Sequence, residues 1–254
     1  MADPQHFVFA LVEDFTHMAF SYAVDPLRIA NLISGKTLYQ WSFASLDGET
    51  AKASNDSVTL VHHSFDKLPQ CDRVFVLSGI HMTGKDHSRL IAALRRERGR
   101  GTAIGALCSG AYILARAGFL DGMMAAIHWD YHDSFMETFP QVNLVRNVFV
   151  ADEKHVTASG GTATADLMLH LIERDHGYDL SVAVADQAEH PSRQVDSSYA
   201  RQFGDPDISN GDCQGPWDFP PPAGAALWEV PQLLAQEILH GNAVGACATP
   251  PIAK

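Results

Sequence analysis

The stretch that decides the fold class is Thr102-Ala103-Ile104-Gly105-Ala106-Leu107-Cys108-Ser109-Gly110-Ala111-Tyr112-Ile113-Leu114-Ala115. A short apolar run leads into Cys-Ser-Gly and then into a helical pattern, which predicts a strand, a sharp turn and a helix. Gly105 and Gly110 flank the turn and allow one backbone segment to approach another closely. Cys108 is expected at the apex, where a helix N-terminus would lower the pKa of its thiol and make it a nucleophile. The stretch therefore predicts a cysteine elbow, with a small buried side chain as the alternative role for Cys108.

The rest of the chain alternates apolar runs with helical patterns. Such alternation predicts a parallel sheet with helices on both faces, in which ligands bind at the carboxyl ends of the strands. Ser78-Gly79, Cys108 and Ser159-Gly160-Gly161 all follow predicted strands, so we expect them to be neighbours in space. Pro26 lies inside a helical pattern and suggests a break or a second helical start there. The predicted strands are 7–12, 39–44, 58–61, 73–79 and 102–107, with a hairpin of 148–151 and 155–159, and the predicted helices are 18–33, 87–98, 131–139 and 163–174.

Composition limits the classes of function. The net charge of −12 opposes direct contact with phosphate backbones. The basic run at residues 95–100 is interpreted as the solvated C-terminal end of a helix rather than as a nucleic-acid patch. Four widely spaced cysteines without a CxxC pattern fit a reducing cytoplasm better than a disulfide framework or a zinc site. We expect neither a membrane span nor a secretory signal, because the chain shows no long apolar run and no basic segment before an apolar core at its start.

The character of the sequence changes after about residue 182. Nine of the 13 prolines lie in 183–254, where nine acidic residues outnumber three basic ones. Dense proline without periodicity predicts a loop-like tail, except for a possible helix at 226–240. We therefore expect a body at 1–182 and an acidic, proline-rich tail at 183–254.

Several motifs, spread in order along the body, carry a resemblance to a known family. The first 182 or so positions resemble the PfpI-like, class I glutamine-amidotransferase-like sensor domain of AraC-type, GlxA-like transcriptional regulators. The motifs are residues 20–31, 34–41 and 53–55, Cys108-Ser109-Gly110-Ala111, residues 114–122, His128-Trp129, Thr157-Ala158-Ser159-Gly160-Gly161-Thr162, and residues 166–167 and 169–177.

This resemblance implies a flavodoxin-like three-layer sandwich that forms a homodimer. It also implies a cytoplasmic regulator whose pocket, near the elbow, senses a small metabolite of the amino acid or quaternary amine class, such as betaine or carnitine. Such regulators normally contact DNA through a C-terminal helix-turn-helix domain. The tail at 183–254 is too short, acidic and proline-rich for one. Either the chain is a sensor domain standing alone, or its gene is truncated or shifted in frame after about Gln187.

The same resemblance leaves an enzyme as the alternative. PfpI-type hydratases, amidases and glyoxalase-like members share the elbow, and thiol catalysis needs an acid or base beside the thiolate. Several of these enzymes place a histidine directly after the cysteine, where this chain has Ser109. Isonitrile-hydratase-like relatives place an aspartate in the first loop, where it has Ala19, although Glu13 or Asp14 could reach the pocket instead. We favour the sensor, with a module that only dimerises as a third class.

The candidate ligand site combines backbone and aromatic groups. Amides near Gly79 and Ser109 could form an anion hole. Phe15, Tyr112 and Trp129 could form an aromatic surface for a quaternary ammonium, although core packing explains each as well. The predicted ligand-binding residues are Phe15, Gly79, Cys108, Ser109, Tyr112, His128, Trp129, Ser159 and Gly160, with Cys108 and Glu13 as candidate catalytic residues.

No metal or cofactor is expected. His128 and His132 would share one face of a helix, and Asp133 could supply a third donor. Without a clearer motif, we interpret them as pocket or surface histidines rather than as zinc ligands.

Overall fold

A seven-stranded sheet forms the centre of the computed structural model, which describes residues 3–80, 82, 84–152 and 155–190. The strand order is β10-β11-β7-β6-β1-β2-β5, and every pair is parallel except β10 with β11. The strands of this sheet are β1 (Gln5–Leu11), β2 (Tyr39–Ser45), β5 (His63–Ser64), β6 (Arg73–Ser78), β7 (Ala103–Cys108), β10 (Phe149–Ala151) and β11 (His155–Ala158). Two small pairs complete the strands: β3 (Thr50–Lys52) with β4 (Val58–Leu60), and β8 (Met124–Ala125) with β9 (Asn143–Leu144).

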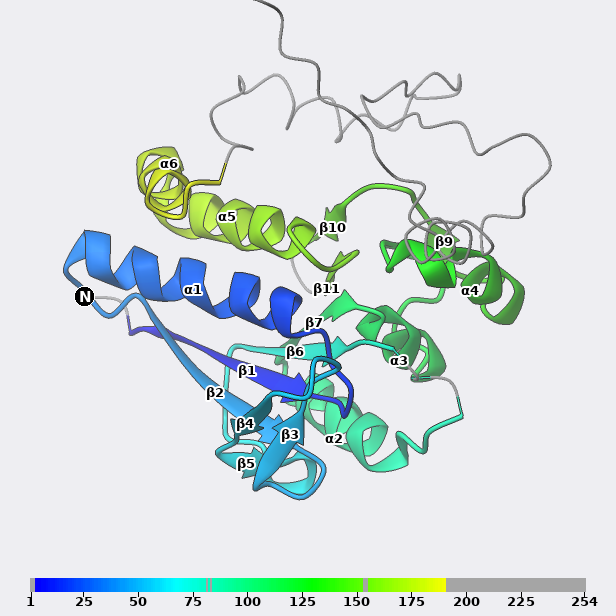
Figure 1. Ribbon diagram of the computed structural model, residues 1–254. Coiled ribbons are helices and arrows are strands. Elements are labelled where there is room, and N and C mark those ends of the chain that lie inside the picture. The colour runs from blue at the N-terminus through cyan, green and yellow to red at the C-terminus, as the bar shows by residue number, and fades with distance from the viewer. Residues whose placement is uncertain (1–2, 81, 83, 153–154, 191–254) are drawn as a thin grey trace, which may run out of the picture. The chain divides into compact units, whose positions relative to one another are not determined.

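Helices cover both faces of the sheet, as Figure 1 shows. One face carries α1 (His17–Ser34), α5 (Ala163–His176) and α6 (Tyr178–Gln187), and the other carries α2 (Ser88–Gly99), α3 (Gly110–Arg116) and α4 (His132–Thr138). Two 3-10 turns, η1 (Phe65–Lys67) and η2 (Trp129–Tyr131), lie between these elements. The expected three-layer α/β sandwich is confirmed.

The apolar strands owe their composition to burial on both faces. In β1, Val8 and Ala10 belong to the apolar cluster under α2, α3 and α4, whereas Phe7, Phe9 and Leu11 belong to the cluster under α1 and α5. A strand that is covered on both sides reads as a continuous apolar run rather than as an alternating one. This is why β1, β6 and β7 are recognisable in the sequence.

The strand order reverses between β1 and β6. From β1 the chain passes through α1 to β2 on one side, and from β6 it passes through α2 to β7 on the other. In open α/β sheets, ligands bind outside the carboxyl ends of the strands at such a point. Here Phe15, just after β1, forms single bridges with Gly79 after β6 and with Ala53. The fold thus brings the loops after β1 and β6 together at that edge.

Two features of the helices differ from expectation. The predicted break at Pro26 is wrong, since α1 is continuous from His17 to Ser34. Pro26 is buried, and α1 packs along α5 and α6, so packing outweighs the hydrogen bond that proline cannot donate. Helix α6 was not anticipated, and it runs past residue 182 to Gln187.

Some expectations fall on parts of the chain that are not described. The possible helix at 226–240, together with Cys213 and Cys247, lies outside the described residues. Within residues 3–190, apart from the gaps named above, no helix combines the length and apolar character needed to cross a membrane.

Candidate functional site

The predicted strand, turn and helix around Cys108 are present. Cys108 ends β7 with a φ of 58°, and α3 begins two residues later at Gly110. A side chain at position 110 is excluded, because a Cβ there would lie 2.3 Å from the Val76 carbonyl oxygen. A non-glycine residue held in the left-handed region stores backbone strain, and such strain gathers at functional sites. The geometry therefore marks Cys108 as the centre of a candidate site.

The Cys108 thiol is buried in the site. Its residue is 4% exposed, and its Sγ lies 3.4 Å from the Thr16 Oγ1. Burial raises the pKa of the thiol above its ordinary value, although hydrogen bonds from Thr16 and from the Ser109 backbone act to lower it. The predicted lowering of this pKa is wrong, because the cost of desolvating a thiolate exceeds the stabilisation that these donors supply.

The other predicted strand-end residues gather around this thiol. The Gly79 carbonyl oxygen accepts hydrogen bonds from the Ser109 hydroxyl at 2.6 Å and from the Tyr131 hydroxyl at 3.2 Å. Gly160 has a φ of 100°, and a Cβ on it would lie 3.0 Å from the Cys108 Sγ. The Ser159 amide donates to the Val148 carbonyl at 2.9 Å, which fixes the start of this loop. The expected proximity of these three strand ends is confirmed.

Thr16 and Tyr131 belong to the site but were missed in the sequence. Thr16 precedes α1 without capping it through its side chain, so its hydroxyl is free to face Cys108. Its place directly after the first strand could have identified it, since such loops form the ligand edge. Tyr131 gave no comparable signal, because its position depends on how η2 folds back over the sheet.

The η2 turn forms an exposed rim. Trp129 is 72% exposed, and its ring centroid lies 5.7 Å from that of His128. His128 accepts a hydrogen bond from the Asp130 amide at 3.4 Å through Nδ1. The pKa of Tyr131 is raised by burial first and then by the nearby Cys108 and Asp130. Asp130 is also the last and smallest of the causes that raise the pKa of Cys108, so this rim includes a carboxylate near the thiol.

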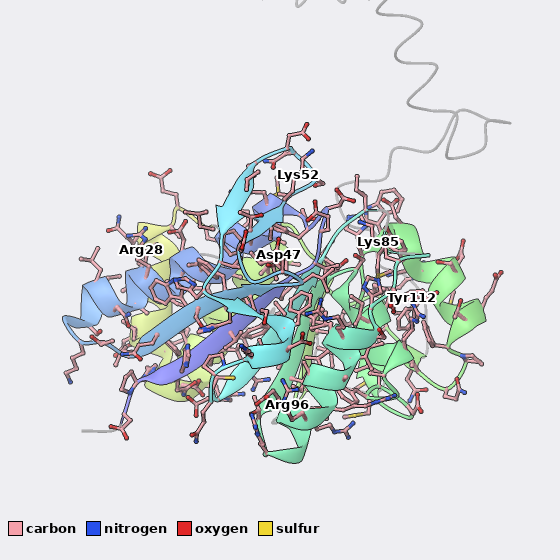
Figure 2. All side chains as sticks on the ribbon, turned by 90° about the horizontal axis from the view of Figure 1, so that it is seen from below. Arg28, Asp47, Lys52, Lys85, Arg96 and Tyr112 are labelled. Carbon is pink, nitrogen blue, oxygen red and sulfur yellow. The ribbon has the colours of Figure 1, made fainter. Side chains whose placement is uncertain are left out.

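The aromatic surface proposed from Phe15, Tyr112 and Trp129 does not form. Phe15 is fully buried under α1, where its ring lies 5.6 Å from that of Phe20. Tyr112 belongs to the apolar cluster on the opposite face of the sheet, where its ring centroid lies 4.8 Å from that of Phe139. Figure 2 labels Tyr112 near α4. Helical periodicity turns Tyr112 toward α4. Only Trp129 of the three presents an open ring face.

The acidic residues of the first loop are turned away from the thiol. The Glu13 Oε2 accepts from the Lys52 amide at 3.4 Å, and the Asp14 Oδ2 lies 2.6 Å from the Lys85 Nζ. Lys85 also donates to the Glu13 carbonyl at 3.2 Å. These contacts tie the loop after β1 to the loop after β6. They leave the hydroxyl of Thr16, rather than a carboxylate, beside Cys108.

The two histidines do not share a helix face. His128 precedes η2, whereas His132 begins α4 and places its Nε2 3.2 Å from the Ile127 carbonyl oxygen. Within the described residues, no three His, Cys, Asp or Glu side chains are grouped as a metal ion would require.

Comparisons with known proteins agree with this geometry. The profile of the DJ-1/PfpI family matches residues 6–174. The HTH-type transcriptional regulator GbdR of Pseudomonas aeruginosa is 38% identical over 184 residues, which cover 72% of this chain and 50% of GbdR. The HTH-type transcriptional regulator GlxA of Rhizobium meliloti is 34% identical over 206 residues, which cover 79% of this chain and 64% of GlxA.

A solved structure is similar over the same region. The crystal structure of an AraC family transcriptional regulator from Pseudomonas putida aligns with a TM-score of 0.68 and 29% identity, covering 73% of this chain and 100% of that one. The chain spans about half to two thirds of the length of the curated regulators that it matches.

Proposed function

Because this chain belongs to the DJ-1/PfpI family, we propose that residues 1–182 form the ligand-sensing domain of an AraC-family transcriptional regulator. The domain binds a small metabolite at the edge where Cys108, Gly79 and Gly160 meet. The similarity to HTH-type regulators along the body supports this proposal.

The contact between Cys108 and Thr16 is the main observation that favours a sensor over an enzyme. Thiol catalysis needs a group that moves protons beside a thiolate. Here burial raises the pKa of the thiol, and its side-chain hydrogen bond goes to a hydroxyl. A hydroxyl can position a ligand, but it is a poor acid or base near neutral pH.

The rim at η2 supports a cationic ligand. Trp129 exposes its ring, and a ring face attracts organic cations. Asp130 follows it and adds a carboxylate whose field reaches Cys108. An amino acid or a quaternary amine would place its cationic group over Trp129 and its remaining atoms toward Gly79 and Gly160.

The proposal extends to the state of the protein in the cell. We infer that the domain acts in the cytoplasm as a homodimer and that contact with DNA depends on a helix-turn-helix domain of the kind the relatives carry by name. Leu32 and Ile33 near the end of α1 are exposed apolar side chains of the type that a second copy would cover. Sedimentation equilibrium of the purified chain tests the dimer, and a monomer at micromolar concentration would contradict it.

A thermal-melt titration tests the sensor. Betaine, carnitine, arginine, other amino acids and short aldehydes are added in turn, and a ligand of the folded state must raise the melting temperature. We expect a saturable rise with one amine or amino acid that is lost in Trp129→Ala and in Cys108→Ala. Tyr178→Ala is the matched control, because it removes an exposed aromatic ring from α6, away from the η2 rim.

Whether the ligand is chemically converted distinguishes a sensor from a thiol enzyme. Mass spectrometry of the mixture should recover the ligand unchanged. Conversion of the ligand that depends on Cys108 would contradict the sensor hypothesis and favour a PfpI-type thiol enzyme. No shift with any amine or amino acid would count against the sensor and direct the search to Cys108 chemistry. The absence of both binding and Cys108 reactivity, together with a tight dimer, would favour a domain that only dimerises.

A further inference from the structure

The turn that follows α6 is held by two other helices. Its last residue, His190, has a side chain that is 10% exposed. The His190 Nε2 donates to the Asp166 Oδ1 at 3.1 Å, because a carboxylate can only accept. The His190 ring centroid also lies 6.5 Å from that of Tyr22. Asp166 belongs to α5 and Tyr22 to α1, so His190 connects the two helices that share a face of the sheet with α6 (Figure 1).

The backbone of this turn is strained. The His190 amide donates to the Ala185 carbonyl at 2.9 Å, and the Glu189 amide donates to the Asp186 carbonyl at 3.1 Å. These two bonds form a Schellman motif, which needs a left-handed residue and usually has glycine there. Glu189 occupies that position with a φ of 52°. A side chain in the left-handed region costs free energy, so the surrounding contacts must hold the turn in place.

Neighbouring side chains do not fill the space beside the turn. A hollow of about 280 Å³ lies there between α1, α5 and the end of α6, and His190 forms part of its wall. The contacts of His190 with Asp166 and Tyr22 are therefore prominent among those that hold the turn.

The two helices that hold His190 both begin at the Cys108 edge. Thr16 precedes α1 and has its Oγ1 3.4 Å from the Cys108 Sγ. Gly160 lies in the loop before α5, and a Cβ on it would lie 3.0 Å from the same sulfur. Asp166 is in the first turn of α5, and Tyr22 lies near the start of α1. Each contact of His190 is thus made close to a segment that borders the thiol.

A ligand beside the thiol must move one of these segments. Cys108 is 4% exposed, so the ligand needs space that Thr16 and Gly160 now fill. Packed helices transmit such a shift as rigid elements. Movement of the start of α1 or α5 carries Tyr22 or Asp166 with it. His190 contacts both helices and loses one of its two partners when they separate.

We propose that residues 188–190 form a latch, which is docked while the Cys108 edge is empty and released when a ligand occupies it. This inference rests on the sensor proposed above and adds the route by which occupation of that site reaches the chain beyond His190. The hydrogen bond to Asp166 keeps the latch docked, and the strain at Glu189 favours its release. Because coupling between two sites is reciprocal, an open latch also makes the Cys108 edge easier to occupy.

Hydrogen–deuterium exchange of the full chain measures the state of the latch. Modification of Cys108 by iodoacetamide takes the place of a ligand, so the test needs no metabolite. The protection factors of the amides at 188–190 should fall about fivefold after modification, the factor that the net contribution of one hydrogen bond implies. Cys108→Ser treated in the same way is the matched control, because its other cysteines are modified equally, and its amides at 188–190 should not respond.

A second pair of variants connects the response to Asp166. In Asp166→Asn the latch is weakened beforehand, so the protection factors at 188–190 should already be low and modification of Cys108 should lower them little further. Asp133→Asn is the matched control, since Asp133 is an exposed acid in the first turn of α4, on the opposite face of the sheet. It should respond as the parent chain does.

Two results would overturn the latch: unchanged protection at 188–190 after modification of Cys108, or a full response in Asp166→Asn. If the modified chain does not stay folded, the reciprocal measurement decides. Cys108 should then react with iodoacetamide about fivefold faster in His190→Ala than in the parent chain, with Cys71 as the internal control for general opening. Equal Cys108 rates would refute the latch. The melting titration uses no modified thiol, so its failure would count against the sensor, whereas failure here counts against the coupling alone.

Discussion

At Cys108 two physical effects oppose each other. The turn places the thiol beside the first amides of α3, which favours a thiolate. Burial under Gly160 and Thr16 favours the neutral thiol, and burial is the larger effect. The α3 helix has only seven residues, and the stabilisation that its N-terminus offers a thiolate is smaller than the cost of removing water from that charge. The residue type and its turn were predictable from the sequence, but the pKa of the thiol was not, because it depends on burial by segments that are distant in the sequence, such as Thr16 and Gly160.

The raised thiol pKa values predict alkaline instability. Burial raises the pKa of Cys71 from 9.0 to about 12 and moves that of Cys108 in the same direction. At pH values between the unfolded pKa of 9.0 and the folded pKa of about 12, the Cys71 thiol is deprotonated in the unfolded chain but protonated in the folded chain. The unfolding free energy must therefore fall as pH rises above about 9. The slope is at most about 1.4 kcal/mol per pH unit for each thiol.

Urea unfolding at pH 8, 9 and 10 measures this loss. Cys71→Ser removes one titrating group, so the decline of the unfolding free energy with pH should be shallower than in the parent chain. The comparison uses slopes rather than absolute stabilities, since the substitution also changes packing. An identical slope in the variant would show that Cys71 does not retain its proton in the folded state.

At the scale of elements, the contact between β6 and α3 depends on the absence of a side chain at position 110. A Cβ there would lie 2.3 Å from the Val76 carbonyl oxygen, and this neighbour is backbone that cannot rotate away. Gly110→Ala should therefore destabilise the protein by about 1–3 kcal/mol, the usual cost of overpacking. Gly99→Ala, at the end of α2, has open space around it and should be neutral or stabilising by up to about 1 kcal/mol.

Urea midpoints of the two variants test this difference. Equal midpoints would mean that α3 can move away from β6 at little cost. The Cys108 alkylation rate provides a second measurement, because a shift of α3 would expose the thiol in Gly110→Ala but not in Gly99→Ala.

The strands and helices differ in how well the sequence predicts them. Strands β1, β6 and β7 were predictable because burial on both faces leaves a continuous apolar signal. The continuity of α1 through Pro26 was not, because packing along α5 and α6 overrides the local preference of proline. Tyr112 is predicted as part of an aromatic ligand surface, whereas its position on α3 directs its ring to Phe139. Tyr131 reaches the site from a turn whose position only the folded chain defines.

At the scale of the whole molecule, both apolar clusters are built from residues 7–185. The similar regulator structure from Pseudomonas putida covers 73% of this chain with its full length, so a body of this extent exists as a separate crystallised chain. The sequence suggests a boundary near residue 182, but α6 continues to Gln187 and buries Val184 and Ala185 completely. We therefore expect that the domain needs all of α6 in order to fold cooperatively with full stability.

Two shortened chains test this expectation. A chain of residues 1–190 should fold and melt as the full chain does, because it keeps both clusters and the His190–Asp166 contact of 3.1 Å. A chain of residues 1–182 loses Val184 and Ala185 from the cluster under α1 and α5, and the loss of one buried valine alone costs about 1.5–3 kcal/mol. Its melting temperature should fall clearly below that of 1–190 in the same calorimetric scan. Equal melting of the two shortened chains would place the boundary at 182, and a low melting temperature for 1–190 would mean that later residues stabilise the body.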